Sequence, residues 1–171
     1  MPDYADSLIK SVLSSNKVIA MIGASANQQR ASYFVLGYLL DHGYEVHPIN
    51  PGLAGQEILG RKVYAALKDV PAPVDMVDVF RAADAVPGIL DEVLAEKDRL
   101  SIKTLWLQLG IVHEEAAAKA SAAGLTVIMD RCPKIEYGRF SGEISWMGVN
   151  RGIIDNRKPA LFRKGGSLKW N

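Results

Sequence analysis

Cysteine, long apolar runs and a basic start are scarce or missing in this chain of 171 residues. The single cysteine, Cys132, excludes an internal disulfide framework and agrees with a reducing compartment. No apolar run reaches the roughly 18 residues of a membrane span. The start, Met-Pro-Asp-Tyr-Ala-Asp, lacks the basic and apolar blocks of a signal peptide. We therefore expect a cytoplasmic protein with no membrane partner.

Catalytic and metal-binding patterns are also missing from the sequence. The three histidines are scattered at His42, His47 and His113, and no His/Cys cluster, paired carboxylates or Ser/His/Asp set accompanies them. The Walker A motif of P-loop proteins is absent as well. We therefore expect no metal site and no catalytic residue, which favours a binding protein over an enzyme without deciding the question.

Composition and charge divide the chain into a body and a tail. The hydrophobic fraction of 49% and the charged fraction of 23% are typical of a globular domain with a real core. The net charge is +1, but residues 151–171 hold six Lys/Arg against the single acid Asp155. We expect one domain over residues 1–139 and a basic tail over 140–171. The tail is interpreted as solvated or packed on a neighbouring subunit, which leaves a homo-oligomer open, rather than as a nucleic-acid binder.

Apolar strand patterns alternate with helical patterns along the body. Strands are expected at 18–22, 44–49, 74–79, 104–107 and 125–129, and helices at 4–15, 32–42, 83–98 and 114–123. The stretch 58–64 reads as irregular or briefly extended, with a helical turn near 65–68. This alternation predicts an α/β fold, with a doubly wound, parallel five-stranded sheet and helices on both faces.

The carboxyl ends of the five strands carry the residues with binding potential, because parallel sheets bind ligands at that edge. The loop after the first strand offers Gly23, Ala24 and Ser25, with Arg30 beyond. Gly23 permits a tight turn whose successive N–H groups can face a phosphate, and Arg30 can reach a pyrophosphate. An ordinary strand–helix turn is the alternative.

The second strand ends in Asn50 and Pro51, where an NAD enzyme normally has an acidic residue. An amide followed by proline offers neither a carboxylate for the ribose of NAD nor an arginine for NADP. NAD(P) is therefore disfavoured, and a plain turn is the alternative for this pair.

The remaining strand ends offer Phe80 and Arg81, then Gln108 and Gly110, then Cys132. Phe80 and Arg81 could meet an adenine or a phosphate, or lie in the core and in solvent. Cys132 lies near Arg131 and Lys134, whose charges lower a thiol pKa and allow a mixed disulfide with a thiol ligand. An inert thiol is the simpler alternative. Asp75 and Asp78, inside the third strand, are assigned capping or rim roles.

Six ordered motifs resemble the small stand-alone CoA-binding domain proteins, which are similar to the N-terminal domain of the succinyl-CoA synthetase alpha subunit. The motifs are residues 22–25 (Ile-Gly-Ala-Ser), 49–51 (Ile-Asn-Pro), 58–64 (Ile-Leu-Gly-Arg-Lys-Val-Tyr), 74–81 (Val-Asp-Met-Val-Asp-Val-Phe-Arg), 105–111 (Leu-Trp-Leu-Gln-Leu-Gly-Ile) and 129–133 (Met-Asp-Arg-Cys-Pro). The resemblance covers roughly residues 10–138. It implies a Rossmann-like fold that binds coenzyme A or an acyl-CoA.

The resemblance also implies roles for particular residues. The loop from Gly23 to Ala26, with Arg30, approaches the CoA phosphates, and Asn50 and Pro51 lie beside the nucleotide. Phe80 and Arg81 flank the adenine or the pantetheine arm, and Gln108, Gly110 and Cys132 form the far side of the cleft. Family members often carry a lysine after the proline, where this chain has Gly52.

Three functions therefore stay open. The first is a CoA or acyl-CoA binder without catalysis of its own, which the empty catalytic inventory favours. The second is an NAD(P)- or CoA-dependent enzyme that uses the same cleft. The third is a protein-interaction module built on a relic nucleotide fold. A ligase reaction is not expected, because the synthetase's second alpha-subunit domain with its phosphorylated histidine has no counterpart here.

Overall fold

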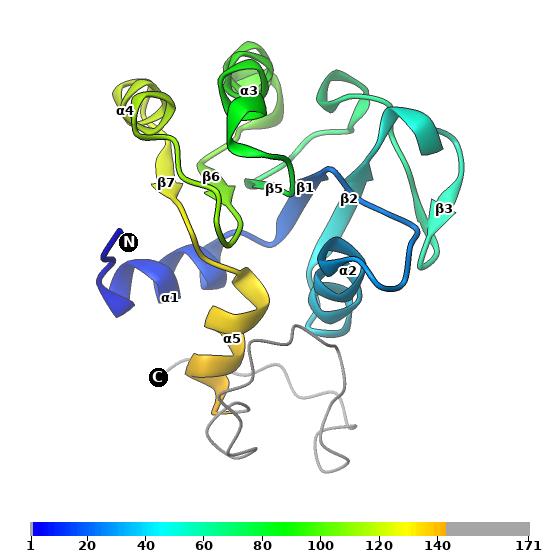
Figure 1. Cartoon of the computed structure of the whole chain (residues 1–171), viewed down its shortest axis with the longest axis horizontal. Coiled ribbons are helices and arrows are strands. Elements are labelled where there is room, and N and C mark those ends of the chain that lie inside the picture. The colour runs from blue at the N-terminus through cyan, green and yellow to red at the C-terminus, as the bar shows by residue number, and fades with distance from the viewer. Residues whose placement is uncertain (1, 143–171) are drawn as a thin grey trace.

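A five-stranded parallel sheet forms the centre of the computed structural model, which describes residues 2–142 (Figure 1). Its strands, in spatial order, are β2 (Glu45–Ile49), β1 (Val18–Ile22), β5 (Met76–Val79), β6 (Thr104–Leu107) and β7 (Thr126–Ile128). All four pairings within this sheet are parallel. The predicted five-stranded parallel sheet is thereby confirmed, with strand ends within two residues of those expected.

Helices cover both faces of the sheet. One face carries α1 (Asp6–Ser15), α2 (Ala31–Asp41) and α5 (Pro133–Ser141), and the other carries α3 (Val86–Leu100) and α4 (Glu114–Ala122) (Figure 1). The strands alternate between the two cores, because successive side chains point to opposite faces. In β1, Ile19 and Met21 belong to the core under α1 and α2, whereas Ala20 and Ile22 belong to the core under α3. The doubly wound Rossmann-like architecture is confirmed.

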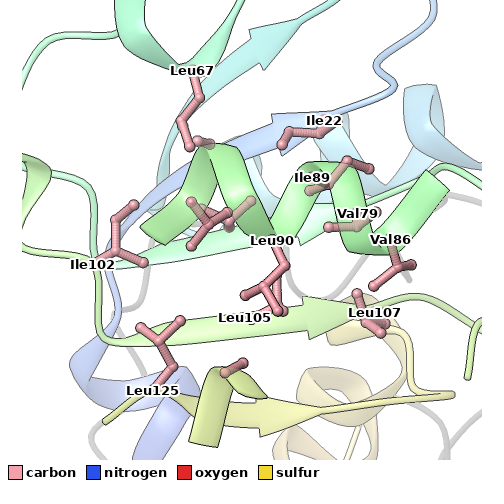
Figure 2. Close-up of a cluster of buried hydrophobic side chains, with 14 of the residues drawn as sticks. Ile22, Leu67, Val79, Val86, Ile89, Leu90, Ile102, Leu105, Leu107 and Leu125 are labelled. Carbon is pink, nitrogen blue, oxygen red and sulfur yellow. The ribbon is translucent and has the colours of Figure 1, made fainter. Parts of the chain in front are cut away.

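The core beneath α3 holds that helix in place over the sheet. Figure 2 shows Ile89 and Leu90 of α3 packed over the strands, with Leu105 of β6 beneath the helix. Leu90 and Leu105 are at most 1% exposed, and burying one such side chain contributes roughly 1.5–3 kcal/mol. The first turns of α3 are therefore fixed close to the end of β1.

The helix α5 was not predicted. Its start suits Pro133, because proline fits the first turn of a helix. Its apolar periodicity is weak, and Arg139 holds it by pairing with Glu136 and with Asp6 of α1. The stretch expected to be irregular or briefly extended contributes to a short antiparallel pair, β3 (Glu57–Ile58) and β4 (Arg61–Lys62).

The expected boundary between body and tail falls inside α5, which continues to Ser141. The rest of the expected basic tail lies outside the described residues, together with the self-association assigned to it.

The strand order places a crevice at the end of β1. From β1 the chain first runs through α2 to β2 on one side, and it later returns to β5 on the other side. The loops after β1 and β5 therefore diverge, and such switch points are where open parallel sheets bind ligands.

Candidate ligand-binding cleft

A cleft of about 750 Å³ opens at this switch point, above the carboxyl ends of β2, β1 and β5. Its size is within the usual range for small-molecule sites. Eight of the residues expected from the sequence line it: Gly23, Ala24, Ser25, Arg30, Asn50, Pro51, Phe80 and Arg81. Four of the expected residues, Ala26, Gln108, Gly110 and Cys132, are not part of its lining.

Gly23 turns the chain sharply as it leaves β1. Its φ of +84° belongs to the left-handed region, which favours glycine. A Cβ at this position would lie 2.8 Å from the carbonyl oxygen of Phe80 and 3.1 Å from Cδ of Arg81. The missing side chain therefore lets the segment after β5 lie directly against the loop after β1.

The N–H groups of this loop are used differently from the sequence-based prediction. Those of Gly23 and Ala24 donate to the carbonyl of Ile49 over 3.1 and 3.2 Å, so they do not face a ligand. The N–H groups of Ser25 and Ala26 have no hydrogen-bond acceptor within residues 2–142. Within this segment, the free N–H groups of the loop therefore begin with those of Ser25 and Ala26, because the N–H groups of Gly23 and Ala24 bind the loop to the end of β2.

Two side-chain turns carry the loop into α2. The Ser25 hydroxyl accepts from the N–H of Asn27 over 3.1 Å, and the Asn27 side chain accepts from Gln29 over 2.9 Å. Arg30 occupies the N-cap without a side-chain cap hydrogen bond. Its carbonyl accepts from Tyr33 and Phe34. Ala31 and Ser32, whose N–H groups have no partner within the helix, both line the cleft.

Asn50 connects the two loops that form the rim. Its side-chain amide donates to the carbonyl of Ala24 over 2.8 Å and accepts from the N–H of Gly52 over 2.9 Å. Its own N–H donates to the carbonyl of Tyr64. At the position where an NAD enzyme has an acid, the side chain of Asn50 is therefore already hydrogen-bonded to backbone groups.

Charged side chains of both signs line the cleft. Arg30 and Arg81 line it without an ion pair to any other residue of the described segment. Glu92 of α3 also lines it. The two guanidinium groups, the N–H groups of Ser25 and the start of α2 together suit an anionic phosphate group.

Gln108 is buried beside β5 rather than exposed at the cleft. It is 5% exposed, and its amide donates to the carboxyl of Asp78 over 2.8 Å. Asp78 is fully buried, and its other oxygen has no hydrogen-bond partner among residues 2–142. Burial raises the pKa of this carboxyl to about 7. The rim role predicted for Asp78 is wrong, whereas Asp75 does cap the N–H groups of Lys17 and Val18.

Cys132 is also buried, with an exposed fraction of 1%. Burial raises the pKa of its thiol to about 12, and the nearby charge of Lys134 lowers it by less. Of the two alternatives, the structure favours the inert thiol, because desolvation of the thiolate outweighs the neighbouring cations. Cys132 is the N-cap of α5, and its side chain lies in the core between the sheet and α1 and α2.

Gly110 and Ala26 lie in exposed loops beyond the lining. The N–H of Gly110 donates to the carboxylate of Asp130 over 2.7 Å, which ties the loop after β6 to the end of β7.

Sequence reasoning missed the part of the cleft lining that lies away from the strand ends. This part contains Ala65 and Ala66, before the short 3-10 helix η2 (Leu67–Asp69), and Gly88, Ile89 and Glu92 of α3. These residues are not at strand ends, so the edge rule could not find them. The spacing of three and four residues along α3 was the available signal.

Metal-binding clusters and membrane-spanning helices are both missing from residues 2–142. No group of three or more His, Cys, Asp or Glu side chains is arranged there to hold a metal ion. No helix in the same segment is long and apolar enough to cross a bilayer.

Comparisons with known proteins converge on one family. A family model described as a CoA binding domain matches residues 17–138. The uncharacterized protein YneT of Bacillus subtilis is 40% identical over 129 residues, which cover 75% of this chain and 91% of that protein. A solved Thermus thermophilus structure, cell-free ID.343, superposes with a TM-score of 0.74 at 39% identity and covers 80% of this chain and 98% of that one. The alpha subunit of ADP-forming acetate–CoA ligase I from Pyrococcus furiosus is 38% identical over 80 residues, 44% of this chain and 17% of the subunit.

Proposed function

The chain belongs to the CoA binding domain family, and we propose that it binds coenzyme A or an acyl-CoA in the cleft, without catalysis of its own. The observation that carries this proposal is the meeting of Arg30, Arg81 and the uncapped start of α2 at the switch point of the sheet. A pyrophosphate is the part of CoA that such a set of donors suits.

The second strand argues for CoA over a nicotinamide dinucleotide. Both polar atoms of the Asn50 side chain are hydrogen-bonded to backbone groups, and no carboxylate replaces them at that turn. The ribose hydroxyls of NAD would therefore lack the acceptor that dinucleotide enzymes provide. CoA has no such requirement at this position, because its ribose carries a phosphate.

The absence of catalysis is proposed from the side chains around the cleft. Within residues 2–142 the lining contains two serines and one glutamate but no histidine, lysine or cysteine. Neither Ser25 nor Ser32 has a histidine or carboxylate partner there to activate its hydroxyl. The lining suits binding better than acyl transfer.

Calorimetric titration with CoA, acetyl-CoA, NAD and ATP tests the proposal. We expect micromolar binding of the CoA species and no heat with NAD. Arg30→Ala should weaken CoA binding about tenfold to a hundredfold, because a charge-assisted phosphate contact is lost. Lys119→Ala is the matched control, since Lys119 lies on α4 and pairs with Asp91. The absence of binding heat with every CoA species, or tighter binding of NAD than of CoA, would overturn the proposed function.

A further inference from the structure

One side of α3 forms a wall of the cleft. Ala85, Gly88, Ile89 and Glu92 all line it, and their spacing of three, four and seven residues puts them on one helical face. Ala65 and Ala66 also line the cleft. Ile89 packs in the same core as Ile22 at the end of β1 (Figure 2). Apart from Glu92, the lining residues of α3 and of positions 65–66 are small or apolar, and the part of the cleft that they line is termed the slot.

Gly88 keeps that slot open. A Cβ built at this position meets no heavy atom within 4 Å, and the residue lies in the first turn of a regular helix. Neither close packing nor an unusual backbone angle therefore requires glycine here, although glycine costs a helix interior roughly 0.5–1 kcal/mol relative to alanine. The space left by the missing side chain is available to a ligand.

Glu92 differs from the other acids of α3. Asp91 pairs with Lys119 over 2.7 Å, Glu96 pairs with Arg99, and Asp98 lies 3.8 Å from Lys97. Glu92 has no ion pair or hydrogen bond with any residue of the described segment, and it lines the cleft. Its carboxylate therefore keeps its full capacity to accept hydrogen bonds from a ligand.

A carboxylate in a cleft that receives phosphates repels the ligand unless it meets a hydrogen-bond donor. We propose that the slot between α3 and residues 65–66 takes the adenine of CoA and that Glu92 accepts from the exocyclic 6-amino group. Glu92 is then the residue that selects adenine over a base with an oxygen at position 6. This inference rests on the proposed function, because the donor edge it invokes belongs to CoA.

Glu92→Gln separates recognition from simple repulsion, because the two give opposite signs. Under recognition, the variant should bind CoA about tenfold more weakly, since a charge-assisted acceptor becomes neutral. It should also bind better than the native protein does to deamino-CoA, whose hypoxanthine has an oxygen at position 6, because the glutamine amide can donate to that oxygen. Under repulsion alone, removal of the negative charge should tighten CoA binding. Asp98→Asn, which removes an acid from the same helix, is the matched control.

Gly88→Leu tests the slot independently of charge. Leucine is a better helix former than glycine, so the helix is retained while the side chain fills the space. We expect CoA affinity to fall at least tenfold, whereas 4′-phosphopantetheine, which lacks the adenosine, should bind equally to both proteins.

The outcomes distinguish the two proposals. A native protein that binds no CoA overturns both. CoA binding that Glu92→Gln leaves unchanged or tightens overturns only the adenine assignment. Weaker binding of 4′-phosphopantetheine to Glu92→Gln also overturns it, because the glutamate would then contact the pantetheine arm.

Discussion

The side-chain amide of Asn50 donates to the carbonyl of Ala24 over 2.8 Å, and this bond ties the turn after β2 to the loop after β1. The two residues are 26 positions apart in the sequence, and the bond between them holds the two loops together at the rim of the cleft. The same Asn50 side chain accepts from Gly52, so both of its polar atoms are engaged. The rim of the cleft therefore depends on an amide that a carboxylate of the same size cannot replace.

Asn50→Asp should destabilise the protein by about 1–3 kcal/mol and weaken CoA binding. The variant retains the acceptor for Gly52 but sets a carboxylate oxygen against the Ala24 carbonyl. It should gain no NAD binding, although it restores the acid of dinucleotide enzymes. Chemical denaturation and calorimetry measure these effects. Asn27→Asp is the control, because only the carbonyl oxygen of the Asn27 side chain is used. Equal stability losses in the two variants would contradict the role of the bond.

Gly23→Ala should cost more stability than Gly43→Ala, although both glycines have a φ of +84°. Alanine in the left-handed region costs about 1–2 kcal/mol at either position. Only at Gly23 does the added Cβ also meet backbone, 2.8 Å from the Phe80 carbonyl oxygen, whereas nothing lies within 4 Å at Gly43. Urea denaturation of both variants measures the difference, and we expect CoA binding to be lost only in Gly23→Ala. Identical unfolding midpoints would rule out the close contact between the two loops.

Asp78 should make folding stability fall as the pH rises from about 4 to about 7. Its pKa is near 3.8 in the unfolded chain and about 7 in the buried native site, so the native state holds the proton more tightly. This contribution is complete below the unfolded pKa and is lost as the pH passes through the native one.

Asp78→Asn removes this dependence, because the amide mimics the protonated carboxyl and still accepts from Gln108. At pH 8 the variant should be more stable than the native protein by on the order of 4 kcal/mol, and at pH 4 the two should agree closely. Urea denaturation from pH 4 to pH 8 measures the gap, and a gap that does not grow with pH would disprove the assignment.

Cys132 should be unreactive in the folded protein. Burial removes the thiol from reagents and raises its pKa to about 12, so little thiolate forms at pH 8. With a single cysteine in the chain, the release of thionitrobenzoate from Ellman's reagent reports on this thiol alone. We expect slow release from the native protein and one equivalent at once in guanidinium chloride. Rapid release without denaturant would restore the mixed disulfide with a thiol ligand as a working hypothesis.

The sequence by itself determined the strands, most of the helices and the edge of the sheet at which most of the predicted cleft residues gather. Apolar runs and helical spacing are local properties, and parallel strands necessarily end at one edge, so Gly23, Arg30, Asn50 and Arg81 were found without a structure. The helix α5 was missed because Pro133–Ser141 has little apolar periodicity, and because its contacts, such as that of Arg139 with Asp6, join residues far apart in the chain.

Only the tertiary structure decided which strand ends meet in the cleft. The ends of β6 and β7 lie one and two strands beyond β5, about 5 and 10 Å farther along the sheet, so Gln108 and Cys132 do not reach the lining. Gly88 and Glu92 face the cleft from within a helix. Strand order and helix placement arise from packing between residues distant in the chain, and local sequence patterns contain no record of those contacts.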